Sequence, residues 1–508
     1  MHLISHSCVV ELDRRQPACA LRLALQNNLL ISVLSFLLLL SINYSGRSTA
    51  ESGDDFITVL TTIALILIAV ALFELIIFIH EGGHFIAAKK SGVQVNEFAL
   101  GMGPKLFSFT KGETTYSLRL FPIGGYCAME GEDEDSENPR SFNNAKIWKR
   151  MIIIVAGAAM NILLGLVLML ITLLPQENFA STTVSQFSAG SFSAVTGLQP
   201  GDKIVEINDY AVNTSTDFSF ALFTLPVKEV DGSELSIYKE DCAYDLYYRA
   251  TELVDKDTTD EQNAALVKTI QTAQEKIAKA DSKEAAYALF SEYYNVLADD
   301  VGKEHADKIP AIEERETRQR FRTDMTVERN GEKVELKDVD FLTTKKSADD
   351  DTPQLRIDFY IEPLEKNFGT VIQQTFASTV SVVRMVWGSL IGLIKGQFSL
   401  NDMSGPVGIA SAITQVAGES LRTSGFGSAV SSIVYIMMVI TINLGVVNML
   451  PFPALDGGRF LMLLIEWIFR KPVPRKVESV INTVGLVLLL GLSAVIAVKD
   501  VWKIFSGG

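Results

Sequence analysis

The sequence predicts an α-helical membrane bundle of four core transmembrane helices, together with an extracytoplasmic α+β domain that carries a helical insertion. One observation is a set of four long apolar runs, at residues 56–79, 151–174, 428–450 and 477–498. Each run is long enough, as a helix, to cross about 30 Å of hydrocarbon. The other observations are an uneven distribution of charge along the chain and strand-like alternation within its long acidic segment.

The charged residues between the runs predict how the chain is oriented. Lysine and arginine gather in 81–150 and in the short loop 459–476. The positive-inside rule places both segments in the cytoplasm, and the four runs then alternate consistently. The net charge of −15 is concentrated in 175–427, which lies outside. We therefore expect a multi-pass protein of the plasma membrane, and this acidity favours no nucleic-acid partner.

The N-terminal extension, residues 1–50, allows two interpretations. Its apolar stretch, 29–42, is short and follows Arg14, Arg15 and Arg22. That pattern is typical of a signal-like region or a short extra span. The alternative is that translation starts further along the chain, so that these residues are dispensable.

The outer segment contains the two ends of one predicted domain. GLQPGD (197–202) is a turn signal, and KIVEI (203–207) alternates as a strand does. Much later, 325–341 contains two alternating stretches joined at Asn330-Gly331, the strongest short hairpin signal. These stretches resemble the beginning and the end of a PDZ domain of the protease type. We expect one PDZ domain over 180–225 and 321–363.

The insertion between these two parts, 227–320, predicts a small helical subdomain. Two stretches repeat apolar residues at helical spacing. Each begins like a capping box, Thr258 with Glu261 and Asp281 with Glu284. The tyrosines of the second stretch are expected to pack rather than to form a binding surface: Tyr287, Tyr293 and Tyr294.

Residues 366–427 predict an amphipathic helix at the outer interface rather than a fifth span. The apolar face of 366–395 is interrupted by polar residues: Gln373, Gln374, Arg384 and Lys395. A fifth span would reverse the last two and put the basic loop 459–476 outside, against the positive-inside rule. The second membrane half is therefore 428–508, opposite a first half over 51–175.

The first apolar run ends in a metal-binding pattern, HEGGH. In a helix, His80 and His84 stand one above the other on one face, so both imidazoles can ligate one metal ion. Glu81 stands beside them and can reach a water molecule on that metal, which is the logic of the HExxH zinc hydrolases. Histidines within the membrane that have no function are rare. This disfavours the alternative that the two histidines only cap the end of the helix near the headgroups.

A zinc site needs a third protein ligand and an open position for water. The other histidines, at positions 2, 6 and 305, lie in the N-terminal extension and the outer insertion, so a carboxylate must complete the set. Asp456 lies at the cytoplasmic end of the third run, at the depth of His80. Its proline and glycine neighbours break the helix, as is tolerated at membrane depth where a cavity is lined. The alternative candidates for the third ligand are Glu74 and Glu466. We expect Glu466 to form an ion pair with Arg470 instead.

Several motifs together resemble the bacterial site-2 protease family, in particular its regulator-of-sigma-E-protease type. They are HEGGHFIAAKKSGVQVNEFALGMGPKLFSF, YSLRLFPIGGY, PRSFNNAKIWKRMIIIVAGAAMN, SGPVGI and NLGVVNMLPFPALDGGRF. The resemblance covers about 56–226 and 321–505, in order, and fails over 1–50 and the insertion. It implies one Zn²⁺ per chain, with metal ligands His80, His84 and Asp456 and the general base Glu81.

The same resemblance implies a substrate class. Relatives cleave transmembrane segments of single-span proteins, such as anti-sigma factors or signal-peptide remnants, after an upstream site-1 protease has trimmed them. Segment 93–129 matches a membrane-re-entrant β-hairpin that can pair with an unwound substrate in the lipid bilayer. Five residues match positions lining the substrate path: Asn161, Asn443, Asn448, Pro451 and Pro453. For the asparagines, interhelical hydrogen bonding is the alternative.

Two features depart from the family pattern. GAAMN (157–161) stands where many relatives have Gly-Pro before the asparagine, which predicts a straighter second span. The insertion splits the only PDZ domain, so sensing by that domain is expected to differ.

Two other classes of function deserve comparison with the protease. A non-catalytic membrane PDZ scaffold with a vestigial metal site would have no reason to keep every metal ligand, and this chain keeps both HEGGH and LDGG. A metal transporter needs polar residues spread through several spans, and the second and fourth spans offer almost none.

Overall fold

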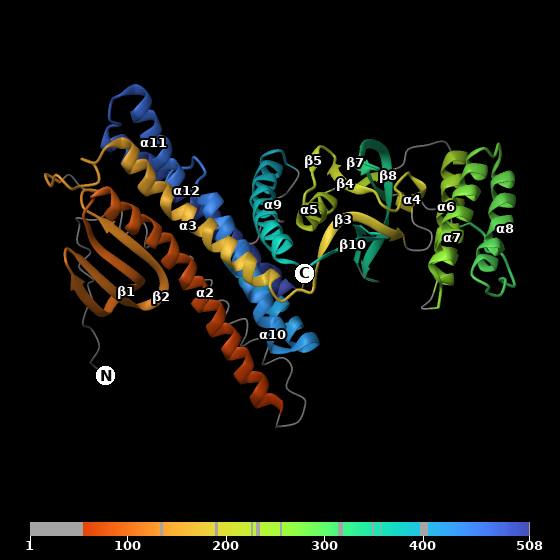
Figure 1. Ribbon diagram of the computed structural model, residues 1–508, viewed down its shortest axis with the longest axis horizontal. Helices are drawn as coiled ribbons and strands as arrows, with labels where there is room; N and C mark the ends of the chain where they lie inside the picture. Colours follow the sequence, from red (N-terminus) through yellow and green to blue (C-terminus); the bar gives the residue numbers. More distant parts are fainter. Residues whose placement is uncertain are drawn as a thin grey trace, which may run out of the picture. The chain divides into compact units, whose positions relative to one another are not determined.

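The computed structural model describes residues 54–132, 136–187, 192–224, 227–229, 234–254, 257–312, 319–347, 350–355, 357–396 and 405–506. The expectations for residues 1–50 lie outside this part of the chain. The chain divides into two compact units, one made of residues up to 175 and from 382, the other of 176–381. Both units are drawn in Figure 1.

The first unit is built on long apolar helices. They are α2 (Asp54–Ser91), α3 (Ile147–Leu173), α10 (Pro406–Asn448), α11 (Asp456–Phe469) and α12 (Arg475–Ser506). α2 ends where Gly92 takes a φ of +83°, and the amide of Val93 then donates to the carbonyl of Ala88. Such a left-handed glycine is a common helix terminator, because it satisfies the last carbonyls without a Cβ clash.

Glycines let the helices of this unit approach closely. α2 packs on α3, and α3 packs on α10 (Figure 1). A Cβ at Gly83 would lie 2.4 Å from the carbonyl oxygen of Ala156, and one at Gly165 would lie 2.3 Å from the side chain of Ile442. Small residues at helix contacts allow this dense packing in membranes, where helices lack a hydrophobic drive to associate. The first three predicted spans, in α2, α3 and α10, therefore pack closely because glycines stand where the helices touch.

Five helices within the described residues are long and apolar enough to cross a membrane: α2, α3, α9 (Phe368–Ile394), α10 and α12. Four of them contain the predicted spans. α9 is the least apolar of the five, and its interfacial placement stays a prediction. α10 is longer than the run 428–450, because its helix continues on the N-terminal side of Gly425, whose φ of 83° interrupts it.

A long β-hairpin covers part of α2. It consists of β1 (Val95–Lys111) and β2 (Thr114–Met129), and β2 packs on α2 (Figure 1). The pairing slips in register along much of the hairpin, and Gly101 and Gly103 adopt φ values of +79° and +83° there. The outer part of the hairpin exposes large apolar side chains: Leu106, Phe107, Phe109, Leu118, Leu120 and Phe121.

The second unit contains an open, antiparallel sheet in the order β10-β3-β4-β7-β8-β9. Its strands are β3 (Asn178–Phe187), β4 (Lys203–Ile207), β7 (Gln319–Arg329), β8 (Glu332–Ser347), β9 (Asp350–Leu355) and β10 (Phe359–Glu365). The short strands β5 (Tyr210–Ala211) and β6 (Val227–Glu229) pair with β4 and β7. The predicted hairpin is formed: Arg329 pairs with Glu332 across Asn330 and Gly331, both with positive φ.

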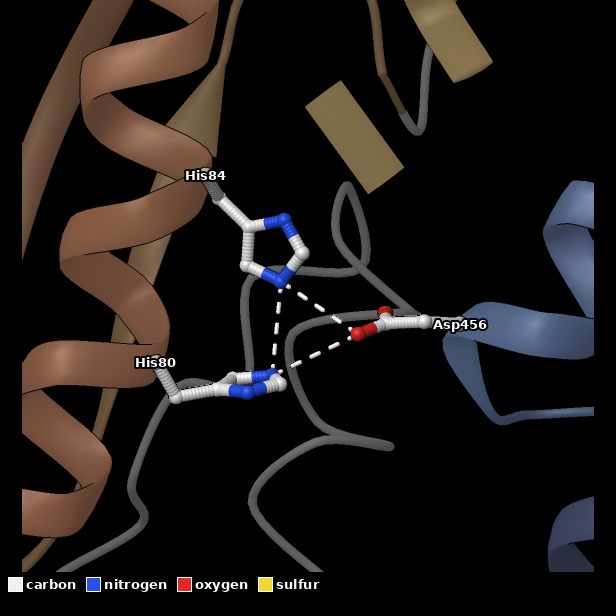
Figure 2. Close-up of side chains that lie close together, drawn as sticks. All are labelled: His80, His84 and Asp456. Carbon is white, nitrogen blue, oxygen red and sulfur yellow. Dashed lines mark hydrogen bonds and ion pairs between the residues drawn. The ribbon is translucent and has the colours of Figure 1, made fainter. Parts of the chain in front are cut away.

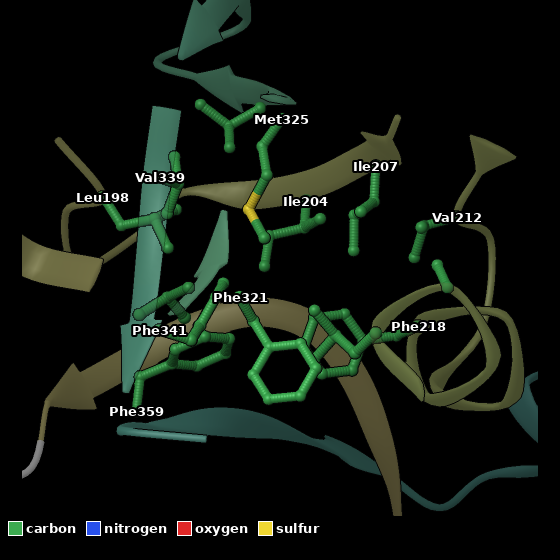
Figure 3. Packing of buried hydrophobic residues seen from close by; sticks show 14 of the residues in the cluster. Leu198, Ile204, Ile207, Val212, Phe218, Phe321, Met325, Val339, Phe341 and Phe359 are labelled. Atoms are coloured by element: carbon green, nitrogen blue, oxygen red, sulfur yellow. The ribbon is translucent and has the colours of Figure 1, made fainter. Parts of the chain in front are cut away.

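Strands from the two sides of the insertion share one core. Figure 3 shows Ile204 of β4 packed with Met325 of β7 and Phe341 of β8, all at most 2% exposed. The helices α4 (Phe192–Val195) and α5 (Ser215–Phe223) connect strands of this sheet. Strands within 178–211 and within 319–365, on the two sides of the insertion, thus belong to a single sheet.

An ion pair at the edge of this core joins the two stretches again. Arg329 donates two hydrogen bonds to the fully buried carboxylate of Asp202, at 2.6 and 2.7 Å, and a third to the carbonyl of Gly197. The hydrogen bonds to Asp202 raise the pKa of the Arg329 guanidinium above its usual value. The GLQPGD turn before the insertion is thereby tied to the strand that follows the insertion.

The described residues of the insertion form three helices: α6 (Glu234–Leu253), α7 (Asp260–Ala278) and α8 (Lys283–Asp300). Their buried residues form a core of their own, in which Tyr293 and Tyr294 are buried, as expected for packing residues. The predicted capping boxes are wrong by one residue. Thr259, with Gln262, caps α7, and Ser282 caps α8, because in each case the later of two adjacent polar residues reaches the free amides.

Candidate metal centre

Three side chains predicted to bind a metal meet in the first unit. The Nε2 atoms of His80 and His84 lie 3.3 Å apart, and the Asp456 Oδ2 atom lies 3.4 and 3.3 Å from them (Figure 2). Both histidines are at most 9% exposed, and the Oδ2 atom of Asp456 is shielded from solvent. Three potential donor atoms thus form a nearly equilateral triangle, with two corners from α2 and one from the first residue of α11.

The size of this triangle suits zinc. At Zn–N and Zn–O bond lengths of about 2.0–2.1 Å, the donors of a tetrahedral ion lie about 3.3–3.4 Å apart. Two imidazoles and one carboxylate are a donor set that zinc accepts, and three protein ligands leave the fourth position open. The residues present therefore fit a catalytic rather than a closed structural zinc site.

A stripe of α3 residues supports the two histidines. The Nδ1 atom of His84 lies 2.8 Å from the carbonyl oxygen of Ile153, so it is protonated and leaves Nε2 free for a metal. One turn along α3, Gly157 makes the room: a Cβ there would lie 2.3 Å from the Nε2 atom of His84. A further turn along, the Asn161 amide lies 3.2 Å from the Nδ1 atom of His80.

Asp456 is held in place by a break between two helices. α10 ends at Asn448, and α11 begins at Asp456. Gly457 and Gly458 lie against the backbone of this break, where Cβ atoms would come within 2.2 Å of Leu450 and 2.3 Å of Phe452 carbonyl oxygens. The prolines and glycines around the aspartate therefore allow the backbone to fold back on itself and aim the carboxylate at α2.

Glu81 lies on α2 between the two ligands in sequence and is 9% exposed. Its Oε2 atom is buried and has no hydrogen-bond partner among the described residues. The hairpin passes close by, since a Cβ at Gly125 of β2 would lie 3.6 Å from the Cγ atom of Glu81. A buried carboxylate oxygen without a hydrogen-bond partner among the described residues thus lies on the residue that follows His80.

The residues predicted to line a substrate path occupy different environments. The Asn448 amide approaches the Nε2 atom of His80, at 3.5 Å, from α10. Asn443 and Pro451 are exposed, and Pro453 is half-buried against Gly485. Asn161 is fully buried. The structure therefore brings two of the three asparagines, Asn161 and Asn448, to the ring of His80.

The two rival carboxylates lie outside the triangle. Glu466 pairs with Arg150 of α3, 3.2 Å away, rather than with Arg470 as expected. Arg470 adopts a left-handed conformation at the end of α11, so it leaves the helical register needed for such a pair. Glu74 lies two turns before Glu81, and both of its carboxylate oxygens are buried.

Two groups that support the histidines, the Ile153 carbonyl and Gly157, were not predicted from the sequence. The carbonyl of Ile153 carries no side-chain signal at all. Gly157 had a usable signal, because Gly157 and Asn161 are four residues apart and must share a face of the second span. Only the contact between α2 and α3 shows that this face meets the histidines.

Comparison with known proteins identifies the family to which the chain belongs. Residues 67–492 match the model of peptidase family M50. A candidate zinc metalloprotease of Clostridium acetobutylicum is 30% identical over 436 residues, covering 86% of this chain and 97% of the relative. The regulator of sigma-W protease RasP of Bacillus subtilis is 28% identical, and the zinc metalloprotease RasP of Bacillus licheniformis is 29% identical. In both, the match covers 88% of this chain and 99% of the relative. The chain therefore belongs to peptidase family M50, the site-2 protease family, and is a multi-pass zinc metalloprotease.

Proposed function

We propose that this protease hydrolyses peptide bonds within or near the transmembrane segments of single-span membrane proteins, after another protease has trimmed their outer parts. Anti-sigma factors and signal-peptide remnants are the expected substrates. One observation carries the proposal: His80 and His84 form a metal triangle with Asp456 while lying inside an apolar helix long enough to span a membrane. A hydrolytic site at that depth serves bonds that soluble proteases cannot reach.

The proposed chemistry assigns one role to each side chain. His80, His84 and Asp456 hold the zinc ion, which, when bound, supplies Lewis-acid chemistry that lowers the pKa of a coordinated water towards about 7. Glu81 accepts the proton of the attacking water and later delivers it to the leaving amine. The Asn448 amide, near the Nε2 atom of His80, is placed to stabilise the developing oxyanion.

The hairpin is proposed to enter the membrane and to present the substrate. Its exposed phenylalanines and leucines suit lipid better than water. An apolar cavity of about 450 Å³ lies between it and α2, and Gly82, the neighbour of Glu81, lines that cavity. A substrate helix hides its carbonyls in intrahelical bonds, so it must unwind before cleavage, and an extended segment can then pair with a strand. Asn443, Pro451 and Pro453 are proposed to line its path.

The sidedness and the outer domain are also proposals. The basic segments 81–150 and 459–476 support a cytoplasmic site, with 176–363 outside. The split sheet supports one PDZ domain over 180–225 and 321–363, interrupted by helices, acting as a filter for trimmed substrates.

The test is the Glu81→Gln variant in membranes that contain a trimmed single-span substrate. We expect this variant to bind zinc as the wild type does and to lose cleavage by at least about 10²–10⁴-fold, the range for a general base. His84→Ala is the matched control, which should lose both zinc and cleavage. Full turnover by Glu81→Gln, or zinc retained by His84→Ala, would refute the assignment.

A further inference from the structure

The amide of Asn161 contacts the imidazole of His80 on the side away from the metal triangle. Its Nδ2 atom lies 3.2 Å from the Nδ1 atom of His80, while the Nε2 atom of that ring faces His84 and Asp456. The Asn161 side chain is 0% exposed, and its Oδ1 atom is buried without a hydrogen-bond partner among the described residues. The amide therefore contacts a predicted metal ligand from a dry position between helices.

The backbone of Asn161 is fixed from a third helix. Thr441 of α10 donates a hydrogen bond of 3.2 Å from its hydroxyl to the carbonyl oxygen of Asn161. Ile153, Gly157 and Asn161 follow one another at four-residue spacing, so they form one stripe of α3 that faces α2. The stripe serves His84 at one end and His80 at the other.

The chemistry of a neutral imidazole decides what this contact does. One ring nitrogen carries the proton and the other has the lone pair, so a ring that ligates through Nε2 must be protonated at Nδ1. The Nδ1–H group then needs an acceptor. The Ile153 carbonyl is that acceptor for His84. For His80 the residue in place is Asn161, and a half-turn of its amide puts the unpartnered Oδ1 atom on the ring.

We propose that Asn161 is a positioning residue, which holds His80 in the tautomer that leaves Nε2 free for zinc. This inference rests on the metal site of the proposed function. It differs from a substrate-binding role for Asn161, because a group that only touches substrate has no effect on metal affinity. It also differs from simple interhelical bonding, which depends on packing and not on an acceptor at the ring.

The experiment measures zinc affinity by chelator competition, and the visible spectrum of the Co²⁺-substituted full-length protein in detergent. Asn161→Leu keeps the approximate volume and removes the acceptor. Asn161→Asp keeps an acceptor at the same place. Thr441→Val is the matched control, since it removes the other hydrogen bond of Asn161 in the same helix contact and leaves the ring alone.

We expect Asn161→Leu to weaken zinc binding by about 10–100-fold, as for other residues behind metal-ligating histidines, and to alter the Co²⁺ spectrum. Asn161→Asp should restore the affinity, and Thr441→Val should leave it unchanged. Unchanged affinity in Asn161→Leu with reduced cleavage would overturn the inference in favour of substrate binding. Equal losses in all three variants would overturn it in favour of packing. Failure of the metal site itself is distinguished by zinc retained in His84→Ala.

Discussion

Gly157 of α3 lies so close to His84 that a Cβ atom at this glycine would sit 2.3 Å from the ring Nε2 atom, the atom that faces Asp456. The same Cβ would lie 2.9 Å from the Cε1 atom of His80. The space that a metal ion needs between the two rings therefore exists because this residue has no side chain.

Gly157→Ala is accordingly expected to weaken zinc binding. Overpacking of a dense site costs about 1–3 kcal/mol, which corresponds to about 5–150-fold in affinity. Gly491→Ala is the control, since a Cβ at this glycine of α12 meets nothing within 4 Å. The zinc affinity of the two purified variants is measured by chelator competition. Wild-type affinity in Gly157→Ala would show that the position of the imidazole rings does not depend on the space at Gly157.

How far the sequence predicted the site depends on the distance between partners along the chain. His80, Glu81 and His84 share one helical turn, so their common face follows from spacing alone. Asp456 could be chosen because few carboxylates reach the right depth. The pairing of Arg150 with Glu466 could not be foreseen, because 316 positions separate them and either residue had nearer candidate partners.

The fold was predictable to a similar degree. Apolar runs located the long helices, and Asn330-Gly331 located a hairpin, because both signals are local. The extension of α10 before Gly425 and the helix α6 were missed. The caps of α7 and α8 were misplaced by one residue, because two adjacent polar residues compete for the same amides and only the backbone geometry selects one.

The ion pair between Arg329 and Asp202 gives a prediction about the second unit. Arg329→Met leaves the fully buried carboxylate of Asp202 without its cationic partner, and such a loss costs about 3–5 kcal/mol. We expect a clearly lower unfolding temperature for this unit, measured by fluorimetry on the purified protein.

The neighbouring pair Lys203–Glu328 provides the control for that measurement. Its side chains are 55% and 43% exposed and 3.7 Å apart, so Lys203→Met should change stability by less than about 1 kcal/mol. Equal effects of Arg329→Met and Lys203→Met would contradict the view that burial of Asp202 makes its ion pair important.

Asp500 gives a prediction about the last helix of the first unit. Its Oδ2 atom accepts hydrogen bonds from the amides of Gly405 and Gly408, at 2.8 and 3.0 Å, so α12 caps the N-terminus of α10. Asp500→Ala leaves the buried amide of Gly405 and the half-buried amide of Gly408 without this acceptor, at a cost of about 1–3 kcal/mol. Asp500→Asn keeps an acceptor oxygen and should lose less. A melting temperature of Asp500→Ala equal to the wild type would show that water replaces the cap.

Cys242 gives a prediction about pH. Burial, with smaller contributions from Asp245 and Asp241, raises the pKa of its thiol to about 12. Only the thiolate reacts with alkylating agents, so at pH 8 the reactive fraction falls to about 10⁻⁴, against about 10⁻¹ for a thiol with a pKa of 9. We expect iodoacetamide to label Cys242 about a thousandfold more slowly in the folded protein than in urea, measured by mass spectrometry of the peptide.

The same raised pKa makes the stability of the fold depend on pH. The folded state favours the protonated thiol, so the contribution of Cys242 to the free energy of unfolding is complete below about pH 9 and decreases as the pH rises towards 12. Rapid labelling of the folded protein at pH 8 would mean that α6 opens far more often than its sealed core implies.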